Sequence, residues 1–156
     1  MLRRGAETFT TSATDFLDHD PGHPDHEARI YIRIKVEGLE AETYAMVDTG
    51  APYSILHPEL AENAGLALGE GEKTKIETRI GKVPGELVRG TIILPAKEGP
   101  GLEVDATIFV PEGEWSLPNF LGYHGFLESI RFAVSPTEYE FHFGRAEGPQ
   151  NLRLVF

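Results

Sequence analysis

The feature that most constrains this chain is an acidic side chain that stands between two apolar segments. Asp48 follows the apolar pair Met46 and Val47, and Ile55 and Leu56 come soon after the turn that it begins. A surface hairpin would alternate polar and apolar residues on its strands, so these flanks predict a turn in the core of a sheet structure. Because a carboxylate is costly to place in apolar surroundings, Asp48 is a candidate functional residue.

The residues after Asp48 suit a tight turn in which polar groups bind one another. Thr49 carries a hydroxyl that can both donate and accept hydrogen bonds. Gly50 can adopt backbone angles that other residues avoid, and its amide can approach an oxygen atom closely. Ala51 completes the turn. Asp-Thr-Gly is also a common sequence of ordinary turns, so a purely structural turn remains an alternative for these residues.

The composition limits the size and the partners of the protein. Its 156 residues are enough for one domain with a substantial core. The formal net charge of -11 argues against nucleic acid and membrane as partners, since nucleic acids and anionic membranes attract clusters of Lys and Arg. The absence of cysteine excludes disulfides and thiol catalysis. No apolar segment suits a secretion signal or a membrane helix, so we expect a soluble, cytoplasmic protein without a cofactor.

The chain divides into an N-terminal arm, residues 1–27, and one domain, residues 28–156. The arm is acidic, and a short strand is expected only around residues 8–10. His19, His23 and His26 stand among aspartates, but prolines prevent the helix that would align them as metal ligands. We therefore expect a solvated loop over residues 15–26 and no metal site. A pro-segment, a strand of the domain and a disordered tail all remain alternatives for the arm.

Two strands and a helix surround Asp48. Over residues 30–36, aliphatic residues alternate with polar or aromatic ones, which is the pattern of a half-buried strand. Residues 42–47 form the next expected strand, and Asp48 stands at its end. A short helix is expected to begin at Pro58, which suits the first helical position, and to end near Gly65, which suits a C-terminal cap.

A hairpin is expected after this helix. Residues 73–80 and 87–94 are two candidate strands, and the segment between them has two glycines and a proline around a basic residue. Such a segment favours a turn that can project and move. The expected turn residues are Gly81, Lys82, Val83, Pro84 and Gly85.

The C-terminal part adds further strands. Residues 102–110 alternate again, residues 131–134 and 139–143 form an expected hairpin, and residues 152–156 form a last strand. Apart from two short helices every expected element is a strand, so the sequence predicts an all-β fold.

Two motifs in this pattern resemble a known family. The turn at residues 48–51, followed by Ser54 and Ile55, resembles the first half of a retropepsin-like aspartic protease domain. The second half of that family's pattern has two apolar residues and a glycine, then a short helix and a final hairpin. A similar motif occurs here at Phe120, Leu121 and Gly122. The resemblance covers roughly residues 28–144.

The resemblance implies a closed, mostly antiparallel β-barrel of the retropepsin type with one or two short helices. It implies an aspartic endopeptidase with one catalytic residue per chain, Asp48, in a loop with Thr49, Gly50 and Ala51. Because no second Asp-Thr-Gly or Asp-Ser-Gly occurs, a working site would need a homodimer. Paired Asp48 carboxylates would then activate a water against peptide or protein substrates. Residues 81–85 would be the tip of a flap that closes over the bound peptide.

The sequence also departs from the family pattern. Tyr123 and His124 stand where retroviral members usually carry Arg and then Asp or Asn, and the expected flap tip is not rich in glycine. Two other hypotheses therefore stand beside the protease. One is a retropepsin-like module that dimerises or binds peptides without turnover. The other is an unrelated β-barrel in which Asp-Thr-Gly is a structural turn.

Overall fold

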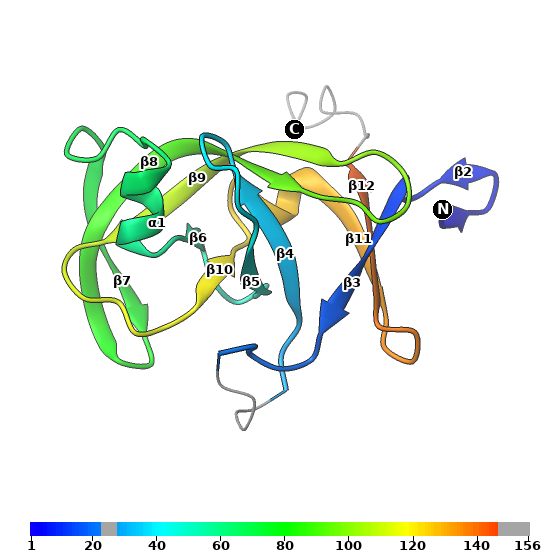
Figure 1. The fold of residues 1–156 in the computed structure, drawn as a ribbon, viewed down its shortest axis with the longest axis horizontal. Coiled ribbons are helices and arrows are strands. Elements are labelled where there is room, and N and C mark those ends of the chain that lie inside the picture. Colours follow the sequence, from blue (N-terminus) through cyan, green and yellow to red (C-terminus); the bar gives the residue numbers. More distant parts are fainter. Residues whose placement is uncertain (23–27, 147–156) are drawn as a thin grey trace, which may run out of the picture.

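The structure is a computed structural model that describes residues 1–22 and 28–146 (Figure 1). Within these residues the chain forms strands, one short α-helix and one 3₁₀ helix, so the expected all-β class is confirmed. The expected strand over residues 152–156 lies outside the described residues. The elements are β1 (Arg3–Arg4), β2 (Glu7–Thr8), β3 (Ser12–Leu17), β4 (Tyr31–Val36), β5 (Thr43–Val47), β6 (Ser54–Ile55), α1 (Pro58–Asn63), β7 (Glu72–Thr78), β8 (Gly81–Leu94), β9 (Leu102–Pro111), β10 (Asn119–Leu121), η1 (Leu127–Ser129), β11 (Ile130–Ser135) and β12 (Glu140–Arg145).

Ten of these strands form one mixed sheet, in the order β11-β12-β3-β4-β5-β10-β6-β9-β8-β7. The pairs β5–β10 and β6–β9 are parallel, and the other pairs are antiparallel. Strand β4 pairs in addition with β8 through Lys35 and Val36. Strands β1 and β2 make a separate small hairpin near the N-terminus, which projects to one side in Figure 1.

The core consists of two apolar clusters that meet at the strand leading to Asp48. The larger cluster contains Ile32 and Ile34 of β4, which are fully buried as the alternation predicts. Ala45 of β5 belongs to this cluster, whereas its neighbour Met46 belongs to the second one, because successive side chains of a strand point to opposite faces. Strand β5 is therefore packed on both sides. The second cluster contains Tyr31, Met46, Ile55, Ile76, Val83, Phe109, Trp115 and Phe120.

Part of the N-terminal segment belongs to the sheet, which is one of the alternatives that the sequence left open for the arm. The sequence predicted a loop from residue 15 onward, but β3 (Ser12–Leu17) pairs with both β12 and β4. Ala13 and Phe16 are buried, while Asp15 is exposed and its carboxylate lies 3.1 Å from the Lys97 ammonium. The acidic composition of this segment concealed the strand because its charged residues face outward. Of the three histidines, His23 and His26 lie outside the described residues.

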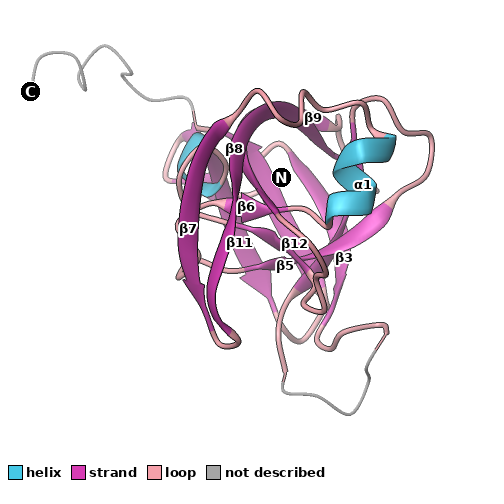
Figure 2. Ribbon diagram, turned by 90° about the vertical axis from the view of Figure 1, so that its left-hand side faces the viewer, coloured by secondary structure: helices cyan, strands magenta, loops and turns pink. Residues whose placement is uncertain are grey.

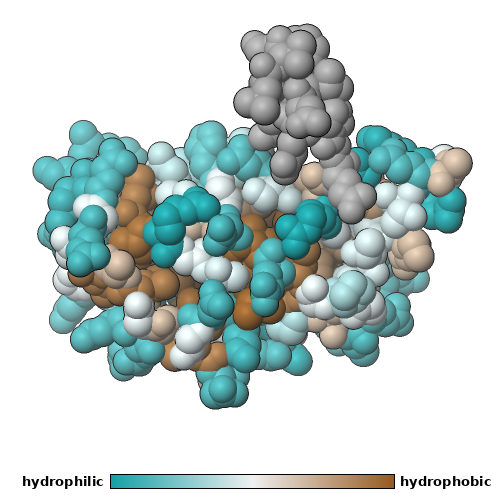
Figure 3. All heavy atoms as spheres, turned by 90° about the horizontal axis from the view of Figure 1, so that it is seen from above, coloured by the Kyte–Doolittle hydropathy of each residue, from teal (hydrophilic) through white to brown (hydrophobic). Residues whose placement is uncertain are grey.

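The expected helix is confirmed as α1, which begins at Pro58 and is followed by Gly65 with a positive φ of 75°. Its inner face is Ala61, fully buried in the larger cluster, and Figure 2 shows the helix on the outside of the sheet. No helix in residues 1–22 and 28–146 is long and apolar enough to cross a membrane. In Figure 3, polar residues surround the places where apolar residues reach the surface.

The β7–β8 hairpin exists, but its turn comes earlier in the chain than predicted. The two strands are paired up to Thr78 opposite Gly81, so the turn is Arg79 and Ile80. The Thr78 hydroxyl donates to the Gly81 carbonyl at 2.8 Å and accepts from the Ile80 amide at 3.2 Å. Gly81 has a φ of 108°, which suits glycine. Figures 1 and 2 show this hairpin at the edge of the molecule, with its turn at the lower end.

The five residues expected in the turn, 81–85, therefore begin strand β8. Pro84 is paired with Lys75 across the hairpin. Val83 is buried in the second cluster, and a Cβ added to Gly85 would lie 2.5 Å from a ring carbon of Phe109. Proline and glycine suggested a turn, but packing against Phe109 holds this segment in the sheet, since tertiary contacts override local propensity.

Candidate active site

Asp48 is placed by the pairing of β5 with β10. These strands run parallel, with Val47 opposite Leu121. The ladder continues one residue further, because the Asp48 amide donates to the Leu121 carbonyl at 3.0 Å. The Ala51 amide then donates to the Asp48 carbonyl at 3.2 Å and closes the turn. The two sequence motifs, far apart in the chain, therefore lie side by side.

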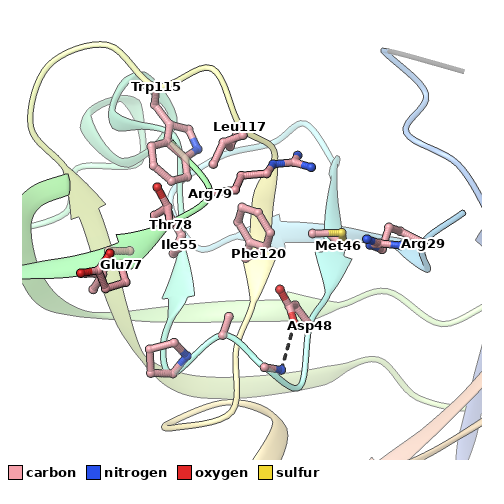
Figure 4. A pocket seen from close by; sticks show the side chains of 14 residues that line it. Arg29, Met46, Asp48, Ile55, Glu77, Thr78, Arg79, Trp115, Leu117 and Phe120 are labelled. Atoms are coloured by element: carbon pink, nitrogen blue, oxygen red, sulfur yellow. Dashed lines mark hydrogen bonds between the residues drawn. The ribbon is translucent and has the colours of Figure 1, made fainter. Parts of the chain in front are cut away.

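The Asp48 carboxylate is oriented within its own turn. The Gly50 amide donates to Asp48 Oδ1 at 2.9 Å, which is the dashed contact in Figure 4. The Asp48 side chain is half-buried and lines a pocket, whereas Thr49 is exposed. One carboxylate oxygen is thus held by the backbone, and no described residue donates a hydrogen bond to the other oxygen.

The second motif packs against the segment that follows the Asp48 turn. A Cβ added to Gly122 would lie 2.2 Å from the backbone carbonyl group of Tyr53, so only glycine fits at this crossing of two chain segments. The Gly122 amide donates to the fully buried hydroxyl of Ser54 at 3.1 Å. The Tyr123 amide continues the contact, donating to the Ala51 carbonyl at 2.8 Å.

A polar residue that was not among the predicted site residues connects the segments around Asp48. Asn119, at the start of β10, accepts a hydrogen bond from the His57 amide at 2.8 Å and donates one to the Tyr44 carbonyl at 3.2 Å. Its side chain thereby joins β5, β10 and the start of α1. The signal in the sequence was an amide residue directly before the apolar pair Phe120 and Leu121.

The pocket in front of Asp48 has a cavity volume of about 340 Å³. Its wall is mostly apolar and comes from the second cluster, while the charged groups on it are few. Figure 4 shows Phe120 in the middle of the pocket and Asp48 below it. The lining residues are Arg29, Met46, Asp48, Gly50, Ala51, Pro52, Ile55, Ile76, Glu77, Thr78, Arg79, Trp115, Leu117 and Phe120.

The hairpin contributes different residues to this pocket from those predicted. Residues 76–79, at the end of β7 and in the turn, line the pocket, while none of residues 81–85 does. The sequence analysis therefore missed Thr78 and Arg79, because it placed the turn too late in the chain. Of the second motif, Phe120 lines the pocket, and Leu121 is fully buried behind it.

The described part of the chain brings no metal site together. No group of three or more His, Asp or Glu side chains in residues 1–22 and 28–146 is arranged to hold a metal ion.

Comparisons with known proteins match this geometry. Residues 32–93 match a family described as aspartyl protease. The fold matches a retropepsin-like aspartic protease from Rickettsia conorii, with 18% sequence identity and a TM-score of 0.54 over 83% of this chain and 97% of that one. The chain therefore has a retropepsin-like fold, and its segment 32–93 is similar to aspartyl proteases. The comparison with curated proteins finds no match.

The likeness to aspartic proteases therefore covers the fold and the segment that carries Asp48. The family match includes Asp48 and the hairpin turn but ends before the second motif. The second motif lies outside the matched segment, and its place beside the Asp48 turn is given by the contacts of Gly122 with Tyr53 and Ser54.

Proposed function

We propose that the protein is a homodimeric aspartic endopeptidase in which the Asp48 carboxylates of two copies activate one water molecule. The observation that carries this proposal is the position of Asp48. Its carboxylate lines an apolar pocket, one oxygen accepts from the Gly50 amide, and the other oxygen has no donor within the described residues.

The need for a second copy follows from the charges around this carboxylate. The other acidic residue on the pocket wall is Glu77, which lies on the opposite side of the pocket in Figure 4. Asp48 and Glu77 therefore do not form a pair, and the paired carboxylate has to come from the same turn of another copy. Thr49 is exposed in the single chain, so its hydroxyl is available to the partner's turn.

The chemistry of the pair follows from electrostatics. Two carboxylates in close contact cannot both stay ionised, so the pair keeps one proton and titrates as a unit. The ionised carboxylate takes a proton from water, and the hydroxide bonds to the peptide carbonyl carbon while the other carboxyl gives its proton to the carbonyl oxygen. On collapse, the C–N bond breaks and the leaving nitrogen receives a proton through the carboxylates.

The hairpin of β7 and β8 is the proposed flap, with Arg79 and Ile80 at its tip. Thr78 and Arg79 already line the pocket, and Ile80 is 54% exposed. An extended peptide bound between this tip and Asp48 would be shielded from water when the tip closes.

The closed barrel is also part of this proposal. Strand β4 pairs with β5 through residues 31–34 and with β8 through residues 35 and 36. This double pairing links the two ends of the series β4-β5-β10-β6-β9-β8 and supports closure. The domain limits 1–27 and 28–156 and the cytoplasmic location stay predictions from the sequence.

The experiment that tests the function is cleavage of a diverse peptide mixture from acidic to neutral pH by the wild type and by Asp48→Asn. Asp105→Asn is the matched control, because the Asp105 side chain is 82% exposed and does not line the pocket. We expect discrete cleavage sites with the wild type and with Asp105→Asn, and none with Asp48→Asn. Folding of each variant is checked by urea unfolding, and its mass by light scattering.

Equal cleavage by the wild type and Asp48→Asn would contradict the proposed function. A dimer that binds peptides without cleaving them at any pH would favour the alternative, a retropepsin-like module without turnover.

A further inference from the structure

The turn of the β7–β8 hairpin carries a cation that no described residue neutralises. Arg79 lines the pocket that contains Asp48. Its guanidinium makes no hydrogen bond or ion pair with any residue in the described part of the chain. Arg33, Arg89 and Arg131, by contrast, each bind a side-chain oxygen. In a protein with 25 acidic residues and 14 basic ones, this exposed arginine at the pocket is available to a negatively charged ligand.

A second arginine lines the same pocket. Arg29 precedes β4, and its guanidinium donates to the Ala28 carbonyl at 2.8 Å. In Figure 4, the guanidinium of Arg79 extends past Phe120 toward the side of the pocket where Met46 and Arg29 lie. The two cations therefore occupy the same side of the pocket, away from Glu77.

The charges of both arginines act on the hydroxyl group of Tyr31. Its side chain is buried in the second cluster. Burial raises the pKa of the Tyr31 hydroxyl, and the negative charge of Asp20 adds to this, while the positive charges of Arg79 and Arg29 oppose it. The charges of Asp20, Arg79 and Arg29 therefore all act on the same phenol.

The acidic residue of the hairpin does not cancel this positive charge. Glu77 lines the pocket, but its carboxylate lies 3.8 Å from the ammonium of Lys82 across the hairpin. The remaining carboxylate, that of Asp48, belongs to the proposed chemistry. Arg79 therefore keeps its positive charge unpaired within the described residues, although the whole chain carries a net charge of -11.

We propose that Arg79 is a specificity-determining residue that binds a carboxylate of the peptide substrate, on the wall of the pocket that Arg29 also lines. The inference rests on the proposed function, whose pocket it uses. A guanidinium matches a carboxylate with two parallel hydrogen bonds. The carboxylate can come from an Asp or Glu side chain or from the C-terminus of a peptide.

The test compares the wild type with Arg79→Gln on a pool of peptides with amidated C-termini, with cleavage sites mapped by mass spectrometry. Lys75→Gln is the matched control, since Lys75 is an exposed cation of the same hairpin that does not line the pocket. The wild type and Lys75→Gln should favour Asp or Glu at one position near the cleaved bond, and Arg79→Gln should lose that preference.

Kinetics on one peptide pair then measure the effect. With Glu at the favoured position, the wild type should show a kcat/KM about tenfold above that for Gln, as expected for one partly exposed charge-assisted contact. This difference should come from a lower KM for the Glu peptide, with the same kcat for both peptides. Arg79→Gln should treat both peptides alike and keep the wild-type kcat on the Gln peptide, because Arg79 does not act on the reacting atoms.

A second peptide pool with free C-termini distinguishes the source of the carboxylate. Arg79-dependent preference for free over amidated ends would assign the subsite to the terminal carboxylate. Cleavage by the wild type without any such preference, or a preference that Arg79→Gln retains, would overturn the inference while leaving the proposed function intact.

The inference can also be tested if the protein cleaves nothing. Immobilised wild type and Arg79→Gln are then loaded with the same amidated pool, and the retained peptides are identified. Retention of acidic peptides that depends on Arg79 would support the subsite without turnover, and equal retention by the two proteins would overturn it.

Discussion

The turn that carries Asp48 and the turn of the β7–β8 hairpin face the same pocket, but they are held in different ways. The Asp48 turn is fixed by hydrogen bonds to the second motif and by the close contact of Gly122 with Tyr53. The hairpin turn is held by hydrogen bonds within residues 78–81, and its tip is exposed. The residue with the proposed chemical role therefore stands on a rigid support, and the residue with the proposed role in specificity stands on a turn that has room to move.

This difference suits the two tasks. A carboxylate that activates water must stay in one orientation, because a small displacement lowers the rate strongly. A flap must open for the peptide to enter and close to exclude water, so it needs few contacts with the rest of the protein. Three substitutions test this contrast, and we give them from the largest expected effect to the smallest.

Gly122→Ala should damage the rigid region most. The added Cβ would lie 2.2 Å from the Tyr53 backbone, and neither chain segment can shift without breaking hydrogen bonds of the Asp48 turn. We expect the free energy of unfolding to fall by about 3 kcal/mol or more, measured by urea unfolding. Gly22→Ala is the control, because its nearest contact is 3.4 Å; an equal effect of the two changes would contradict the tight crossing.

Ser54→Ala should have an intermediate effect. It removes the buried hydroxyl that accepts from the Gly122 amide at 3.1 Å, and the amide is then left without a partner in the core. The expected loss is about 2 kcal/mol in the free energy of unfolding. The exposed Ser129, changed to Ala, should stay within about 0.5 kcal/mol of the wild type. If Ser54→Ala matched that control, the hydroxyl would not support the turn.

Ile80→Ser should leave stability almost unchanged. The Ile80 side chain at the hairpin tip is 54% exposed, so the free energy of unfolding should change by no more than about 0.5 kcal/mol. If the tip covers bound peptide, KM for a cleaved peptide should rise instead. A loss of stability as large as that of Ser54→Ala would mean that the tip is packed, and the contrast between the two turns would fail.

The same contrast explains what the sequence could predict. The Asp48 turn was predictable because its position depends on local residues, namely the apolar flanks and the glycine whose amide binds the carboxylate. It was also predictable that the two motifs belong together, since each resembles a short, specific part of the same family pattern. The contacts made by Asn119 were not, because its partners are the His57 amide and the Tyr44 carbonyl, and these meet it only in the folded chain.

The hairpin turn was misplaced for a physical reason. Glycine and proline at residues 81–85 favoured a turn, but Val83 is buried and Gly85 packs against Phe109. These contacts depend on the second cluster, which local sequence does not show. Strand β3 was only one alternative for the arm and was not located, for a similar reason, since Ala13 and Phe16 are buried beside exposed acidic residues. Arg79 was identified as a candidate specificity residue only from the structure, which places it in the turn and on the wall of the pocket.

The most direct test of the central claim, that two Asp48 residues share one site, is a subunit-mixing experiment. Wild type and Asp48→Asn are mixed at constant total concentration, allowed to exchange subunits, and assayed on one cleaved peptide. If each site needs both carboxylates, activity should fall with the square of the wild-type fraction, because mixed dimers are inactive. Activity proportional to the wild-type fraction would contradict the account, since each chain would then act with its own Asp48 alone.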